Sequence, residues 1–163
     1  MNVVRNGFTL IELIVVIILI AIMAATVVPK ILTSSDFEEY TYRDELITKL
    51  RSIQLRSMQQ TNNSACQLIQ IGTTIIGLRA TTENATTCEP ASTYAGETTT
   101  VKINDSHNVS FSISENLPSF SFSDLGKPQG CSAISPCEIT ITVTGNNALN
   151  VRINSQGYVY ALE

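Results

Sequence analysis

Residues 7–13 read GFTLIEL, and the apolar run LIVVIILIAIMAATVV occupies residues 13–28. From Phe8 to Val28 the only ionisable side chain is that of Glu12. As a helix rising about 1.5 Å per residue, this segment would be roughly 32 Å long, close to a bilayer core of about 30 Å. The pattern therefore predicts a membrane-spanning helix over residues 8–28.

Glu12 needs an explanation, because a carboxylate in an apolar helix costs on the order of a few kcal/mol near the centre of a bilayer. The nearest cations are Arg5 and Lys30, and both lie outside the segment. A cut between Gly7 and Phe8 would supply a closer partner. The new amine of Phe8 would lie one helical turn from Glu12, or would meet Glu12 of a neighbouring subunit in an assembly.

The stretch GFTLIEL, the apolar helix behind it and Pro29 resemble the class III signal of type IV pilins and of type II secretion pseudopilins. This resemblance implies that prepilin peptidase removes residues 1–7 by cleavage between Gly7 and Phe8, and that Phe8 is N-methylated. It also implies that Glu12 sets subunit registration and that Pro29 kinks the helix. The expected location is the bacterial inner membrane, with a periplasmic C-terminal domain, and afterwards a filament.

Two other interpretations of this segment are weaker. A cleaved secretory signal has an apolar core of about 7–15 residues and a small-residue cleavage site, whereas this core is longer and contains Glu12 at its entrance. A plain membrane anchor would leave Glu12 without a role.

The net charge of the chain limits the classes of function that are possible. The 163 residues carry a formal net charge of −4, and removal of residues 1–7 takes away Arg5 and leaves −5. This acidic balance argues against a nucleic-acid-binding protein, which needs a basic face for phosphates.

Four cysteines follow the apolar segment, and they allow three pairings. Proximity alone favours Cys66–Cys88 and Cys131–Cys137. An even number of cysteines beyond a membrane segment suits an oxidising periplasm. Zinc is the alternative, but the spacings lack a C-x₂-C pair and His107 is the only histidine.

Residues 29–61 are predicted to continue the helix in amphipathic form into the domain, with residues 34–36 as a local weak point or a fresh N-cap. Apolar residues at helical spacing predict the face that packs on a sheet: Phe37, Tyr40, Leu46, Ile47, Leu50, Ile53 and Met58.

Residues 62–163 are predicted to form a β-rich periplasmic domain, because the hydrophobic period changes to two. We expect hairpins over residues 66–79, 99–114 and 149–162, a strand over residues 138–144, and a long loop over residues 81–100 that Cys88 partly pins. Phe120 and Phe122 continue the alternation. The predicted fold class is α+β and type IV pilin-like: a long N-terminal helix packed on an antiparallel β-sheet or sandwich.

A second pattern lies in the C-terminal half: FSDLGKP at residues 122–128, two strands, and then Gly157-Tyr158-Val159. It resembles minor subunits such as the H-type pseudopilin and FimT-type pilins, and residues 42–60 are similar to the minor pilin of the mannose-sensitive haemagglutinin pilus. Only five residues separate Cys131 from Cys137, and the chain continues for 26 more. That differs from the disulfide-bounded loop common near the C-terminus of major pilins.

We find no catalytic pattern and no cofactor motif, so we expect no enzymatic activity. His107 lies in a predicted turn, residues 104–108, whose oxygen atoms could hold calcium; a simple β-turn explains the same residues. The predicted function is a minor pilin that acts in the initiation or at the tip of a type IV pilus, with other pilin subunits and prepilin peptidase as partners. The alternatives are a type II secretion pseudopilin, or a tip adhesin that uses residues 81–100 to bind a surface ligand.

Overall fold

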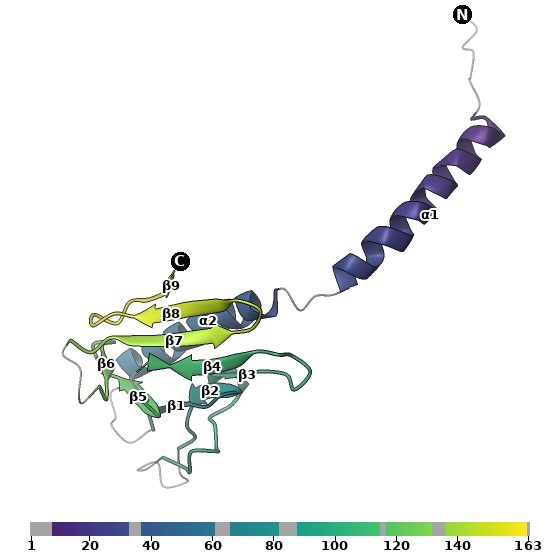
Figure 1. The fold of residues 1–163 in the computed structure, drawn as a ribbon. Coiled ribbons are helices and arrows are strands. Elements are labelled where there is room, and N and C mark those ends of the chain that lie inside the picture. The colour runs from purple at the N-terminus through teal and green to yellow at the C-terminus, as the bar shows by residue number, and fades with distance from the viewer. Residues whose placement is uncertain are drawn as a thin grey trace, which may run out of the picture. The chain divides into compact units, whose positions relative to one another are not determined.

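A computed structural model describes residues 8–32, 37–60, 66–81, 88–114, 117–131 and 136–162, without the side chains of residues 27–32. The chain divides into two units, residues 1–34 and residues 35–163. The first unit holds helix α1, Leu10–Leu32. The second holds the remaining elements (Figure 1).

The second unit begins with helix α2, Glu38–Gln59, and continues with strands. The strands are β1 (Ile69–Ile71), β2 (Ile75–Leu78), β3 (Thr100–Lys102), β4 (Ser110–Ile113), β5 (Ser119–Phe122), β6 (Pro128–Gln129), β7 (Ile139–Thr144), β8 (Ala148–Ile153) and β9 (Val159–Leu162). A single 3₁₀ turn, η2 (Glu97–Thr99), precedes β3.

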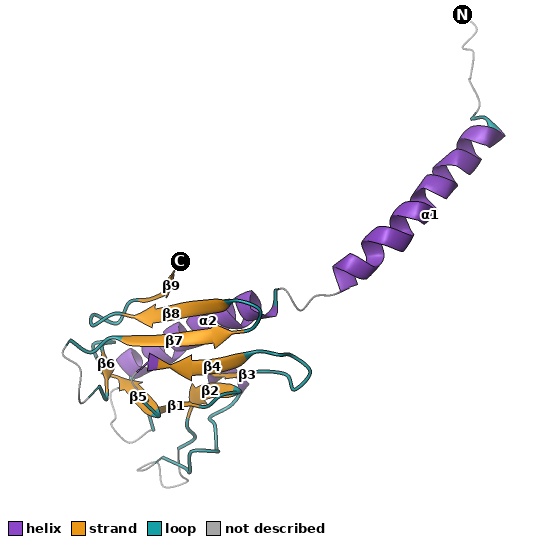
Figure 2. Cartoon of the chain, in the orientation of Figure 1, coloured by secondary structure: helices purple, strands orange, loops and turns teal. Residues whose placement is uncertain are grey.

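The strands form two antiparallel sheets. One has the order β3-β2-β1-β5-β6 and the other the order β4-β7-β8-β9. In the second sheet β7 and β8 pair along their whole length, with Ile141 opposite Val151. Figure 2 shows β7 and β8 of the second sheet in front of α2. The predicted α+β class, with a helix on antiparallel sheets, is confirmed.

Two of the predicted hairpins are present. β1 and β2 turn at Gly72, whose N–H donates to the carbonyl of Ile75 at 2.8 Å. β8 and β9 turn through Asn154, whose carbonyl accepts the N–H of Gly157 at 2.8 Å. In both cases a short turn that contains glycine joins two strands, and the second turn also contains Asn154 and Ser155.

The predicted hairpin over residues 99–114 is wrong. β3 pairs with β2 in the first sheet, and β4 pairs with β7 in the second. Val101 and Phe111 are both buried, as the alternation requires. Alternation fixes which face of a strand is buried but not which strand lies beside it, and residues 103–109 are long enough to cross between sheets stacked about 10 Å apart.

Helix α2 packs against strands of both sheets. Its buried face consists of Glu39, Tyr42, Leu46, Leu50, Ile53 and Ser57. The predicted face was therefore correct in its centre and wrong at its ends, because Phe37 is 71% exposed and Tyr40 and Met58 are also exposed. The proposed weak point at residues 34–36 lies outside the described residues, and α2 begins at Glu38 after Phe37.

The core joins α2 to both sheets in one cluster. Its largest strand side chains are Phe120 and Phe122, whose rings meet edge to face with centroids 5.5 Å apart. Burial of apolar side chains at about 25 cal/mol per Å² is the main source of stability for such a domain. The packed core of the second unit therefore fixes the positions of α2 and of the turns that contact it.

Candidate assembly site

The start of α1 is organised by Thr9 and Glu12. The hydroxyl of Thr9 accepts the backbone N–H of Glu12 at 3.3 Å, and the carbonyl of Thr9 accepts the N–H of Leu13 at 3.3 Å. Thr9 is thus the N-cap and Glu12 the third helical residue, the spacing of a capping box. The sequence analysis missed this role of Thr9, although the T-x-x-E pattern is visible in the sequence.

The position of Glu12 in the first turn has an electrostatic consequence. A carboxylate near a helix N-terminus is stabilised by the helix dipole, whereas an amine there is not. If the chain were to begin at Phe8, its positive amine would lie just ahead of the helix, and Glu12 would offset it. Phe8 itself is 75% exposed, and Gly7 lies outside the described residues.

The described side chains of α1, from Leu10 to Thr26, are exposed in the first unit. Apolar residues lie on all sides of this helix, which is typical of a helix covered by lipid or by other helices. Among the described residues, no helix reaches the length and hydropathy expected of a membrane span.

The backbone of α1 continues past Pro29 to Leu32. The helix therefore does not stop at the proline, as expected, and the bend at Pro29 stays a prediction. Proline lacks an N–H and so leaves the carbonyl four residues earlier, that of Ala25, without its usual helical partner.

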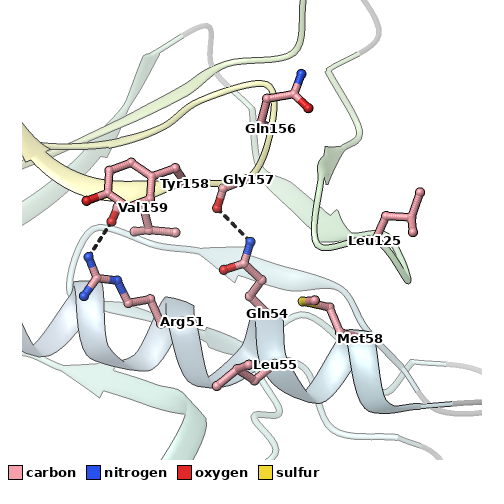
Figure 3. A pocket seen from close by; sticks show the side chains of 9 residues that line it. All are labelled: Arg51, Gln54, Leu55, Met58, Leu125, Gln156, Gly157, Tyr158 and Val159. Atoms are coloured by element: carbon pink, nitrogen blue, oxygen red, sulfur yellow. Dashed lines mark hydrogen bonds between the residues drawn. The ribbon is translucent and has the colours of Figure 1, made fainter.

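On the second unit, an open groove of about 440 Å³ lies between α2 and the β8–β9 turn (Figure 3). Its apolar lining includes Leu55, Met58, Leu125 and Tyr158, each at least half exposed. At one side, Arg51 donates to the carbonyl of Val159 at 2.8 Å. The apolar lining is thus held by polar contacts between α2 and the turn.

Gln54 brings together the two ends of the C-terminal sequence pattern. Its side-chain N–H₂ donates to the carbonyl of Gly126 and to that of Gly157, each at 2.7 Å. Gly157 has a φ of +91°, and a Cβ atom there would overlap the carbonyl of Gly126. The sequence showed both glycines as turn formers, but not that they meet at one helical side chain.

The sequence predicted only a turn at His107, but the structure also places its ring against two side chains of α2. The Tyr42 hydroxyl lies 2.8 Å from His107 Nδ1, and Glu38 Oε1 lies 3.5 Å from Nε2. The N–H of Asn104 donates to the Tyr42 hydroxyl at 3.0 Å. The Tyr42 hydroxyl thus lies between the His107 ring and the main chain of Asn104.

The predicted turn beside His107 is present. The N–H of His107 donates to the carbonyl of Asn104 at 2.9 Å, and the Asn104 side chain accepts from the N–H and hydroxyl of Ser106. These bonds belong to an ordinary Asx-type turn. Within the described ranges, no group of three or more His, Cys, Asp or Glu side chains is arranged to hold a metal ion.

Glu39 is a buried acid that the sequence analysis did not single out. It is 0% exposed, and its Oε1 atom accepts the backbone N–H of Asn147 at 3.2 Å and the Asn147 side-chain N–H₂ at 2.9 Å. Burial raises the pKa of this carboxyl, but hydrogen bonds from Asn147 and from the main chain of the same turn outweigh burial, so that the pKa lies below its ordinary value.

Both disulfides join the pairs that proximity favoured. Cys66 is bonded to Cys88, and Cys131 to Cys137. The N–H of Cys66 also donates to the hydroxyl of Thr81 at 3.0 Å, so that Cys66 is bound to the predicted loop at its first residue and at Cys88. All four cysteines are therefore used in structural bonds.

The comparisons with known proteins address both units. Residues 4–28 match the model of the prokaryotic N-terminal methylation motif. No curated protein matches the chain in sequence.

Two crystal structures of the type IV minor pilin FimU from Pseudomonas aeruginosa (strain PAO1) share the fold. One has a TM-score of 0.55 at 12% identity and covers 77% of this chain and 89% of FimU. The other has a TM-score of 0.52 at 13% identity and covers 76% of this chain and 92% of FimU. The predicted resemblance to minor subunits of the type IV pilin family is confirmed: the chain joins a prokaryotic N-terminal methylation motif to the fold of a type IV minor pilin.

Proposed function

We propose that the chain is a minor pilin subunit, processed by prepilin peptidase between Gly7 and Phe8, that takes part in the initiation or at the tip of a bacterial type IV pilus. The observation that carries the proposal is the methylation motif at residues 4–28 ahead of a FimU-like fold. The narrower assignment to the mannose-sensitive haemagglutinin pilus remains a prediction.

In this proposal the inner membrane covers the apolar side chains of α1 before assembly, and the helices of other subunits cover them afterwards. The C-terminal domain lies in the periplasm, where the two disulfides form. Glu12 pairs with the N-methylated amine of Phe8 on an adjacent subunit. Removing one partner of a buried charge pair costs about 3–5 kcal/mol, because the other charge is left unpaired.

The proposal is tested in a strain that lacks the gene, complemented with the wild-type chain, with Glu12→Val, or with Asp44→Val as a control. Asp44 is an exposed acid on α2, so the control removes the same charge from a solvated site. The chain is then quantified in sheared surface filaments and in the inner membrane. We expect the wild type and the control in both fractions, and Glu12→Val in the membrane alone.

Three results would overturn parts of the proposal. Normal incorporation of Glu12→Val would contradict the pairing with Phe8. Normal filaments in the deletion strain, together with periplasmic accumulation of secreted proteins, would assign the chain to a type II secretion pseudopilus. Normal filament numbers with lost surface adhesion would indicate a tip adhesin, and residues 81–100 would then be the first region to mutate.

A further inference from the structure

The first turn of α2 is held to the domain in a different way from the rest of that helix. Phe37, the residue before the helix, makes no side-chain cap. Before Leu46, the only buried apolar side chain on α2 is that of Tyr42. The start of the helix therefore depends on polar contacts.

Those polar contacts come from turns of two different sheets. From the β7–β8 turn, Asn147 donates twice to the buried carboxylate of Glu39. From the β3–β4 connection, Asn104 donates to Tyr42 and His107 lies against Glu38. The β7–β8 turn and the β3–β4 connection thus contact Glu38, Glu39 and Tyr42 at the start of α2.

The fit around Glu39 is close. A Cβ atom on Gly145, at the start of the β7–β8 turn, would lie 2.8 Å from Glu39 Oε2, so the turn approaches the carboxylate as only glycine permits. Hydrogen bonds to a charged, buried group are stronger than those between neutral groups, and both bonds from Asn147 are lost together when the carboxylate is withdrawn. The Glu39 side chain therefore makes much of the contact that keeps the first turn of α2 docked on the domain.

The remainder of α2 is held by different contacts. Leu46, Leu50 and Ile53 are each 1% exposed, and Arg51 and Gln54 donate to carbonyls of the β8–β9 turn. These contacts do not involve the β7–β8 turn. Regions with few buried apolar contacts open locally at a lower free energy than the core.

We propose that the first turn of α2, residues 38–41, is a releasable latch that detaches from the β3–β4 and β7–β8 turns while the rest of α2 stays docked, and that Glu39 controls its release. Unwinding four residues, from about 1.5 Å to about 3.4 Å per residue, would lengthen the connection to the first unit by about 8 Å. A role for this added length in a filament would rest on the proposed function, whereas the release of the latch does not.

The titratable groups around the latch are Glu38, Glu39, Tyr42 and His107, with Asp105 exposed in the same loop. Protonation of Glu39 removes the charge that Asn147 binds. Acid is therefore expected to open the latch only when Glu39 itself becomes protonated, below about pH 4.3, the ordinary value for glutamate.

The test is hydrogen–deuterium exchange of the purified full chain in mild detergent at neutral pH. The variant is Glu39→Gln, and the control is Glu45→Gln, which makes the same change of charge on the same helix. We expect exchange at residues 41–45, whose N–H groups bond to the carbonyls of residues 37–41, to rise about tenfold or more in Glu39→Gln. The segment of α2 from Leu46 onward and strands β7 and β8 should stay within about twofold of wild type. The control should leave all segments unchanged.

Two outcomes would overturn the proposal. An equal rise across all of α2 and both sheets would mean that Glu39 stabilises the fold as a whole, and no rise would mean that it does not hold the first turn. If Glu39→Gln fails to fold, Asn147→Ala removes one of the two donors from the opposite side, and the same local signature is expected. Because this measurement needs no filaments, its failure is distinguishable from failure of the proposed function.

Discussion

The two disulfides should contribute unequally to stability, because they close loops of different length. In the chain-entropy model a bridge stabilises the folded state by restricting the unfolded chain, and longer loops gain more. Cys66 and Cys88 are 22 residues apart, whereas Cys131 and Cys137 are 6 apart. The model gives about 3.4 kcal/mol for the first bridge and about 2.2 kcal/mol for the second.

The variants are the double substitutions Cys66→Ala/Cys88→Ala and Cys131→Ala/Cys137→Ala, and each serves as the control for the other. Urea unfolding of the full chain in mild detergent, followed by circular dichroism, gives the free energy of unfolding. With a slope of about 1.5 kcal/mol per molar urea, the midpoint should fall by about 2.3 M for the first variant and by about 1.5 M for the second. A smaller loss for the first variant than for the second would refute the reasoning from loop length.

Three further predictions follow from single residues. Gly157→Ala should lower the free energy of unfolding by about 2 kcal/mol or more, because its Cβ would overlap the carbonyl of Gly126. Gly96→Ala is the control and should lose less, because Gly96 also has a positive φ but has open space around it. Equal losses of the two variants in urea unfolding would contradict the packing argument. Because the folded-state pKa of Glu39 is lowered, its stabilisation of the first turn of α2 is fully present above the unfolded value of about 4.3 and is lost as the pH falls through the folded value. The difference in amide protection at residues 41–45 between wild type and Glu39→Gln should therefore be large at pH 7 and shrink below about pH 4. A difference that grows toward acid would contradict this assignment. Glu12→Gln should reduce incorporation into filaments less than Glu12→Val, since the amide still accepts a hydrogen bond from an amine. The ratio of the chain in filaments to the chain in the membrane measures incorporation. Equal incorporation of the two variants would count against the pairing of Glu12 with the Phe8 amine.

The sequence was informative wherever a local pattern decides the structure. The hairpins at Gly72 and Asn154, the turn at Asn104 and the helix centred on Leu50 each follow from residues close together in the chain. The N-terminal motif is local too, which is why residues 7–13 sufficed to indicate the family.

Contacts between distant segments were not predictable in this way. The alternation in β3 and β4 is the same whether they pair with each other or with strands of different sheets. The sequence does not single out Glu39, because its contacts are made with a turn more than a hundred residues away. The meeting of Gly126 and Gly157 at Gln54 is likewise a result of the tertiary fold.

The central claim is that the N-terminal segment is a prepilin signal, and mass spectrometry of the N-terminal peptide tests it most directly. The protein should be purified from its native membrane and digested without chemical modification of its amine. We expect a chain that begins at N-methylated Phe8. A chain that begins at Met1 would leave only an anchored domain, and a start beyond Pro29 would mean ordinary secretion; either result would contradict the role assigned to Glu12.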